Sequence, residues 1–188
     1  MSNPLKVLMF FLNYIKKLLS MTSLLFFNLY CLREDREHKA LTGVSSIRKA
    51  IKFLTEPVQK ELRKCKFKIG IDFSFESTKG VGNEKTISIL SGPTDDPYMT
   101  YDADLITPTD EESEEALKAL DVALRESMDW SGLQAGDLII IDNNRTVHSR
   151  TSYKPKFDGK DRWLQRIFVK ANKVEPEIML EKKLSIIA

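Results

Sequence analysis

Three strand-like runs near the end of the chain limit the fold most, because only short loops connect them. They cover residues 138–142 (LIIID), 146–150 (TVHSR) and 163–169 (WLQRIFV). Gly136-Asp137 leads into the first run, and Asn143-Asn144 turns the chain into the second. The first run is apolar from Leu138 to Ile141. The last run has apolar side chains on each of its two faces. We therefore expect both strands to be covered on both faces.

The rest of the chain adds more strands, one long helix and a few shorter ones. Strands are predicted at 23–32, 67–71 and 86–90, and an extended segment at 98–104. Helices are predicted at 4–19, at 44–54, from Glu56-Pro57 onward, and at 108–128 with Thr107 or Thr109 as cap. This order lacks a regular βαβ alternation, so it favours a two-sheet antiparallel core over a doubly wound fold.

The bulk composition narrows the class of protein. A length of 188 residues suits one domain, and a net charge of +2 without an uncompensated basic block gives no basis for nucleic-acid binding. The apolar runs before residue 33 are each shorter than the roughly 18–20 residues of a membrane span, so a membrane partner is not expected. Cys31 and Cys65 form neither a disulfide framework nor a zinc motif, which favours a reducing cytoplasm.

A histidine and several arginines mark the candidate site. A lone histidine at a strand end is more often structural than a ligand, but Arg150 shares a strand face with His148. On the last strand Arg162 and Arg166 share a face and stand roughly 13 Å apart at about 3.3 Å per residue. Such cations require anions, which could be internal acids such as Asp158 or Asp161, or a bound acid.

These residues lie in a segment that resembles a known family. Residues 136–169 carry Gly136-Asp137, Asp142-Asn143, Arg145, His148, Arg150 and Asp161-Arg162-Trp163. The segment is similar to the end of the clavaminate synthase-like and asparagine oxygenase-like Fe(II)/2-oxoglutarate-dependent oxygenases, within the taurine dioxygenase-like superfamily. The resemblance extends more weakly back to about residue 23. It implies a mainly β fold with helical insertions, a double-stranded β-helix (jelly roll, cupin-like) that is incomplete at its N-terminal end.

The resemblance also implies roles for individual residues. His148 takes the place of the distal iron ligand, and Arg162, fourteen positions later, that of the anchor for the far carboxylate of 2-oxoglutarate. Thr42 would help to hold this cosubstrate. Asp102, Asp104 and Arg166 match positions that face the substrate, which would be an amino acid or a similar small polar molecule. Fe(II) is the implied metal, because a triad of two histidines and one carboxylate leaves positions open for the 2-oxo acid and oxygen.

The first half of the iron site has no counterpart in this sequence. The family's His-x-Asp or His-x-Glu pair would fall roughly 28 residues before Thr42, where the chain has Tyr14, Ile15 and Lys16. The other histidine, His38, has no such acid after it. We therefore expect a truncated oxygenase domain at 23–175, after an apolar segment at 1–22 and before a tail at 176–188. The alternatives are a carboxylate-binding pseudoenzyme, an enzyme whose site is completed by another chain or by unusual ligands, and an inert, membrane-associated remnant.

Overall fold

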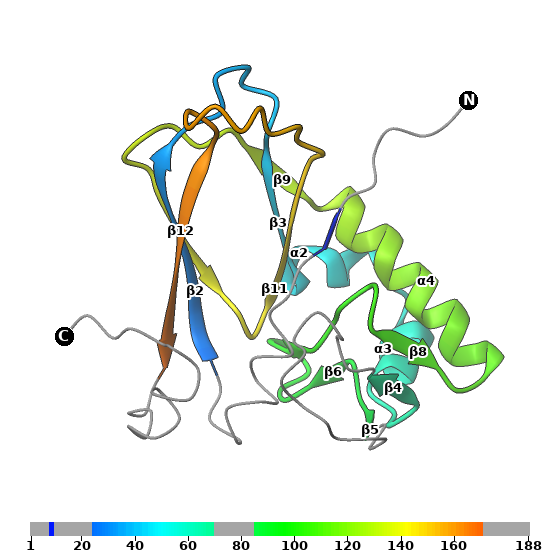
Figure 1. Cartoon of the computed structure of the whole chain (residues 1–188). Helices are drawn as coiled ribbons and strands as arrows, with labels where there is room; N and C mark the ends of the chain where they lie inside the picture. Colours follow the sequence, from blue (N-terminus) through cyan, green and yellow to red (C-terminus); the bar gives the residue numbers. More distant parts are fainter. Residues whose placement is uncertain (1–7, 10–23, 70–84, 171–188) are drawn as a thin grey trace, which may run out of the picture.

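Two facing β-sheets with helices over one of them form the described part of the chain (Figure 1). The computed structural model describes residues 8–9, 24–69 and 85–170. Neighbouring strands pair in an antiparallel manner throughout both sheets. This is the double-stranded β-helix arrangement, although the described strands do not close into a barrel. The predicted two-sheet antiparallel core is confirmed.

The first sheet has the order β10-β2-β12. Its central strand is β2 (Leu24–Arg33), with β10 (Leu138–Asp142) on one side and β12 (Trp163–Lys170) on the other. In the register, Phe27 lies between Ile141 and Phe168, and Leu29 lies between Ile139 and Arg166. All these side chains therefore point to the same face, which is the face toward the second sheet.

The second sheet has the order β1-β11-β3-β9. These strands are β1 (Leu8–Met9), β11 (Thr146–Arg150), β3 (Thr42–Ser46) and β9 (Asp129–Ser131). Thr42 pairs with Arg150, and Val44 pairs with His148. Thr42, Val44 and His148 thus share the face toward the first sheet, whereas Gly43, Ser45 and Val147 point the other way.

A helical layer covers the outer face of the second sheet (Figure 1). It contains α2 (Ile47–Ala50), η1 (Ile51–Phe53), α3 (Glu56–Leu62) and α4 (Glu111–Glu126). Short strands lie beside it in two small sheets. One has the order β5 (Lys85–Ile87), β4 (Phe67–Ile69), β8 (Ile106–Pro108). The other pairs β6 (Leu90–Ser91) with β7 (Tyr98–Met99). The main apolar core, which includes Val147, lies in this layer. A second, smaller cluster between the sheets centres on Phe27, Leu29 and Ile141.

Several predicted elements are confirmed, and others are shifted for identifiable reasons. The helix predicted over 44–54 begins only after Ser46, whose side chain accepts a hydrogen bond from the Arg48 N–H, because residues 42–46 pair with β11 instead. The long helix is capped by Asp110 in a capping box with Ser113, so neither Thr107 nor Thr109 is the cap and Pro108 ends β8. Residues 103–105 form a turn and not an extended segment.

The predicted burial of two strands is wrong on one face. Leu138 and Ile140 of β10 are 52% and 64% exposed, and Trp163 of β12 is 57% exposed. The inner faces are packed as expected, but no described element lies on the outer face of this sheet. The helix predicted over 4–19 is also wrong at Leu8–Met9, which pair with the edge of β11, and its other residues lie outside the described part. No helix in the described ranges is long and apolar enough to cross a membrane.

Candidate functional site

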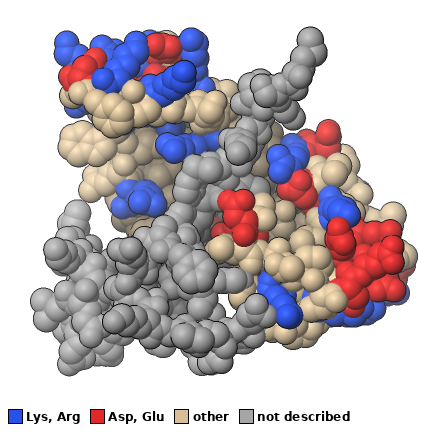
Figure 2. Space-filling model, turned by 45° about the vertical axis from the view of Figure 1, so that its right-hand side comes forward, with Lys and Arg blue, Asp and Glu red and all other residues tan. Residues whose placement is uncertain are grey.

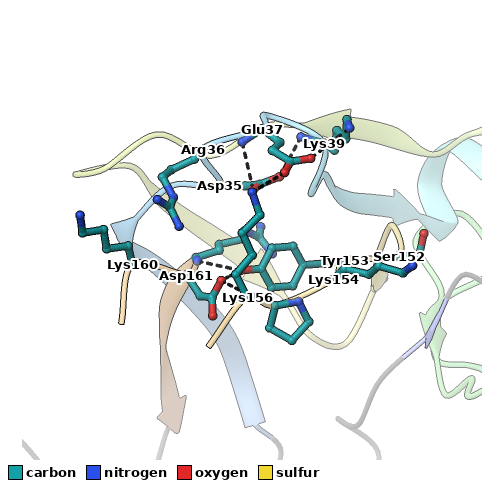
Figure 3. A pocket seen from close by; sticks show the side chains of 12 residues that line it. Asp35, Arg36, Glu37, Lys39, Ser152, Tyr153, Lys154, Lys156, Lys160 and Asp161 are labelled. Atoms are coloured by element: carbon teal, nitrogen blue, oxygen red, sulfur yellow. Dashed lines mark hydrogen bonds and ion pairs between the residues drawn. The ribbon is translucent and has the colours of Figure 1, made fainter. Parts of the chain in front are cut away.

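The site lies between the two sheets, at the end where two long loops meet. The loop 34–41 connects β2 to β3, and the loop 151–162 connects β11 to β12. Figure 2 shows Lys, Arg, Asp and Glu side chains gathered at this end of the molecule. The two loops and Arg162 line a cleft of about 580 Å³ (Figure 3).

Arg162 and Thr42 join the two sheets at the base of this cleft. The Arg162 Nη2 donates to the Thr42 Oγ1 at 2.9 Å, and Thr42 is 3% exposed. The Arg162 Nε is buried and has no hydrogen-bond partner, and burial lowers the pKa of the guanidinium from its ordinary value. A partly buried guanidinium without a carboxylate partner is costly, so this cation can accept an external anion. The structure thus brings together two residues that the sequence placed in one cosubstrate site.

The backbone of Arg162 is held by Tyr153 and Asp161. The Tyr153 hydroxyl accepts from the Arg162 N–H at 3.1 Å and donates to the Asp161 Oδ1 at 3.0 Å. The Asp161 carboxylate also accepts from the Lys156 and Phe157 N–H groups at 2.9 and 2.7 Å. These bonds lower the pKa of Asp161 and fix the turn from which Arg162 projects.

Ion pairs connect the two loops across the cleft (Figure 3). Lys156 pairs with Glu37 at 2.7 Å, and Arg36 pairs with Asp158 at 2.5 Å. Asp35 closes its own loop, because its carboxylate accepts from the N–H groups of Glu37, Lys39 and Ala40. The predicted alternative, in which Asp158 or Asp161 neutralises Arg162, is therefore wrong, since both carboxylates are engaged elsewhere.

His148 projects from β11 into the space between the sheets. Its ring stacks on Phe27 of β2, with ring centroids 4.4 Å apart and planes 27° apart. Burial, helped by the positive charge of Arg166, lowers the pKa of His148 to about 4. The imidazole is therefore neutral at physiological pH, which is the form that binds metal ions.

Arg166 lies on the same inner face of β12 as Leu164 and Phe168, as the period-two pattern predicts. Its side chain is exposed, and its charge acts on His148. Within the described residues no ion pair to Arg166 is found. Arg162, Arg166 and the neutral imidazole of His148 thus face the space between the sheets, and Arg150 lies on the same strand face as His148.

The two predicted substrate-binding acids lie in the turn between β7 and β8. Asp102 is 8% exposed, and its Oδ1 accepts from the Asp104 N–H at 3.0 Å. The negative charge of Asp102 also contributes to a raised pKa of Tyr101, whose hydroxyl donates to Asp121 of α4. These contacts place Asp102 beside the helical layer, and its role toward a substrate stays a prediction.

The described residues do not fit an iron ion by themselves. Among them no group of three or more His, Cys, Asp or Glu side chains could hold a metal. His148 supplies one imidazole, whereas a ferrous oxygenase needs a second histidine and a carboxylate. By contrast, Arg162 and Thr42 do fit the far carboxylate of a 2-oxo diacid, because the guanidinium has an unused donor and a fixed orientation.

Sequence reasoning missed the residues that support this site. Phe27 was predicted only as part of the strand at 23–32, and Asp35 and Tyr153 lie in segments to which no role was assigned. Asp161 was included in the family resemblance without a role. The contact of Phe27 with His148 joins segments more than 100 residues apart, whereas Asp35, Tyr153 and Asp161 act through hydrogen bonds inside irregular loops. The one local signal was that Asp161 directly precedes Arg162.

The described residues thus form part of a jelly-roll fold in which Arg162 and Thr42 meet between the two sheets. Residues 79–168 match the family model of the taurine catabolism dioxygenases, the TauD, TfdA family. Clavaminate synthase 2 of Streptomyces clavuligerus is 37% identical over 146 residues, covering 77% of this chain and 45% of that protein. The L-asparagine oxygenase of Streptomyces coelicolor is 33% identical over 144 residues, covering 77% of this chain and 43% of that protein.

A solved structure shows the same fold. The crystal structure of an asparagine oxygenase in complex with Fe(II), 2S,3S-3-hydroxyasparagine and succinate matches with a TM-score of 0.73 and 31% identity. It covers 81% of this chain and 47% of that one. Over most of its described length the chain is therefore similar to the TauD-like oxygenases of the clavaminate synthase and asparagine oxygenase kind. It spans less than half the length of the relatives that it matches.

Proposed function

We propose that this chain forms the cosubstrate-binding part of an Fe(II)/2-oxoglutarate-dependent oxygenase that hydroxylates an amino acid or a similar small polar molecule. The observation that carries the proposal is the partly buried Arg162 guanidinium, which donates to Thr42 and keeps a buried, unpartnered Nε. In this class of enzyme, iron and the 2-oxo acid carry the oxidation, while the protein binds, orients and excludes water.

Different residues of the chain would bind the cosubstrate, the metal and the substrate. Arg162 and Thr42 hold the far carboxylate of 2-oxoglutarate, since a guanidinium matches a carboxylate better than an ammonium does. His148 offers a neutral imidazole to the metal, with its ring held in place by stacking on Phe27. Arg166 is available for a carboxylate of the substrate or cosubstrate, and Asp102 and Asp104 for the substrate's polar end. The remaining metal ligands come from polypeptide outside the described residues.

A ligand-binding experiment on the purified chain tests the anchor. We expect 2-oxoglutarate to raise the melting temperature saturably, and pyruvate, which lacks the far carboxylate, to raise it much less. Arg162→Ala should abolish the effect of 2-oxoglutarate. Arg63→Ala is a matched control, because Arg63 donates only to the Gly92 and Pro93 carbonyls on the helical side. An unchanged shift in Arg162→Ala would refute the assigned role.

The same geometry supports a second candidate, a carboxylate-binding module without oxygenase activity. Two cations without acidic partners in the described residues face the inter-sheet space, and only one metal ligand accompanies them. This module would bind 2-oxoglutarate as above and would gain nothing from Fe(II). The two candidates therefore differ in the metal dependence of binding.

A further inference from the structure

The cleft between the loops 34–41 and 151–162 carries more positive than negative charge, and we call it the loop cleft. Figure 2 shows the charged side chains grouped at this end of the molecule, and Figure 3 shows Lys156 extending from one loop toward Glu37 of the other. Three of the lining side chains are carboxylates, whereas six are cations: Arg36, Lys39, Lys154, Lys156, Lys160 and Arg162.

The three carboxylates are already engaged by donors within the loops. Asp35 accepts from three backbone N–H groups of its own loop. Asp161 accepts from the Tyr153 hydroxyl and from two backbone N–H groups. Glu37 pairs with Lys39 at 3.0 Å and with Lys156 at 2.7 Å. These acids fix the shape of the two loops and leave the other cations of the loop cleft without an acidic partner inside it.

Two lysines and Arg162 supply the excess positive charge. Lys154 and Lys160 are exposed, and no ion pair to either is found in the part of the chain that the structure describes. Arg162 donates to Thr42 and keeps a buried Nε without a partner. A cleft lined by charges of one sign focuses their field and raises the local concentration of counter-ions. The loop cleft should therefore attract small anions toward Arg162.

The two ion pairs that cross the loop cleft are exposed and can exchange partners. Lys156 and Glu37 have side chains 58% and 45% exposed, and those of Arg36 and Asp158 are 46% and 40% exposed. Ion pairs with this exposure contribute little to stability, so a carboxylate that enters can replace an acidic partner at low cost. A dicarboxylate is attracted at both of its ends, whereas a monocarboxylate is attracted at one.

We propose that the loop cleft is an entry site for small dicarboxylates, where Lys154, Lys156 and Lys160 favour dianions over monoanions on the way to Arg162. This inference rests on the proposed function and adds to it the residues that select the charge of the cosubstrate. The alternative is a solvated basic surface, which would treat anions as the rest of the molecule does.

A thiol placed in the loop cleft measures its attraction for anions in the absence of any bound acid. Ser152 lines the loop cleft and is exposed. In a Cys65→Ser background the remaining Cys31 is buried. Ser152→Cys in this background would react with the dianionic reagent dithiobis(nitrobenzoate) and with the neutral reagent dithiodipyridine. The ratio of the two rate constants removes the intrinsic reactivity of the thiol and reports the attraction for the dianion.

The same ratio at Val122→Cys, on the exposed side of α4, is the reference. In about 0.01 M salt, where the Debye length is about 30 Å, we expect the ratio at Ser152→Cys to be about tenfold higher than at Val122→Cys. In about 1 M salt, where the Debye length is about 3 Å, the two ratios should become equal. Equal ratios at low salt would overturn the proposal.

Two double variants separate local charge from net charge. Lys154→Gln with Lys160→Gln should lower the low-salt ratio at Ser152→Cys about threefold or more. Lys60→Gln with Lys118→Gln removes the same net charge from α3 and α4 and should leave the ratio unchanged. An equal fall in both double variants would overturn the assignment of the lysines.

Titration calorimetry separates this inference from the proposed function. Lys154→Gln with Lys160→Gln should raise the dissociation constant of 2-oxoglutarate about threefold to fivefold at low salt, raise that of pyruvate less, and have no effect at high salt. Arg162→Ala should abolish binding of 2-oxoglutarate at both salt concentrations. A raised thiol ratio in a chain that does not bind 2-oxoglutarate would contradict the proposed function alone. Binding that depends on Arg162 but not on the lysines or on salt would contradict the entry site alone.

Discussion

Arg162 shows how much of a binding site one side chain can determine. Its role was implied by the family resemblance, which places it fourteen positions after His148, and its face was expected from the alternation along the predicted last strand. The structure adds a physical basis for the proposed binding of an anion, which is partial burial beside Thr42 with an unused Nε donor. A cation held in this way gains more from a bound carboxylate than a solvated one does.

Thr42→Val tests the contribution of the hydroxyl. The substitution preserves the β-branched shape but removes the acceptor for the Arg162 Nη2. We expect the dissociation constant of 2-oxoglutarate to rise about fivefold to tenfold, which corresponds to roughly 1 kcal/mol for one hydrogen bond. Titration calorimetry measures this change. Thr146→Val is the control, because the Thr146 hydroxyl donates to the Asp142 carbonyl at the end of β11 that lies away from Thr42. An equal loss of 2-oxoglutarate affinity in Thr146→Val would contradict the role of Thr42.

Tyr153→Phe tests the support of Arg162. Removal of the hydroxyl leaves the Arg162 N–H without an acceptor and Asp161 without one donor. We expect a loss of roughly 1–2 kcal/mol in the free energy of unfolding and weaker binding of 2-oxoglutarate, with binding of pyruvate unaffected. Tyr98→Phe alters an exposed tyrosine of β7 and should leave binding of both acids unchanged. Equal weakening for pyruvate would point to general loosening of the loop.

At the scale of elements, the strands could be predicted from the sequence but their environments could not. β2 and β12 follow from apolar and alternating runs. Their burial does not, because the exposure of Ile140 and Trp163 depends on what lies over the sheet. The boundary between β3 and α2 was missed because Val44, Ile47 and Ile51 repeat at helical spacing, while pairing with β11 holds Val44 in a strand.

Gly43 is a strong constraint on the packing of β3 between β9 and β11. A Cβ at this position would lie 2.8 Å from the Ser149 Oγ and 2.8 Å from the Trp130 ring. Gly43→Ala should therefore lower the free energy of unfolding by roughly 1–3 kcal/mol, as overpacking does. Gly132→Ala is the matched control, since its Cβ would make an ordinary 3.5 Å contact with Leu41. Chemical denaturation of both variants decides the matter; equal stabilities would contradict the expected clash.

An ion cluster joins the segment before β7 to the turn between β10 and β11, and it predicts a pH dependence. Asp96 pairs with Arg48 at 2.7 Å and with Arg145 at 2.9 Å, and these hydrogen bonds hold the pKa of its carboxyl far below the usual range. Because the folded-state pKa is depressed, this stabilisation is present above the unfolded pKa of about 3.9 and is lost as the pH falls below it.

The corresponding variant is Asp96→Asn. We expect a lower melting temperature than wild type at pH 6 and a smaller further drop between pH 6 and pH 3. Asp95→Asn, on the exposed neighbouring residue, should follow the wild-type curve. Thermal melts across this pH range measure the difference, and parallel curves for Asp96→Asn and wild type would show that the cluster adds no pH-dependent stability.

At the scale of the whole molecule, the two outer faces of the described sandwich differ in their cover. Helices and the main core lie on the side of β3 and β11, whereas Leu138 and Ile140 are exposed on the outer face of the β10-β2-β12 sheet. The site between the sheets is divided in a similar way. The proposed anchor for a diacid is made of Arg162 and Thr42, whereas His148 is the one proposed metal ligand among the described residues.

An anaerobic titration with Fe(II) and 2-oxoglutarate relates this asymmetry to the metal. The chain alone should show no saturable visible charge-transfer band, because a single imidazole is too weak a chelate. A complex of the chain with the separately expressed part of clavaminate synthase 2 that it does not match should show one, because the proposed function takes the remaining ligands from outside the described residues. His148→Ala should remove the band, and His38→Ala should retain it, since His38 lies exposed in the loop between β2 and β3. A band in the complex that survives His148→Ala would exclude His148 as a ligand. A band from the chain alone would mean that residues outside the described ranges complete the site.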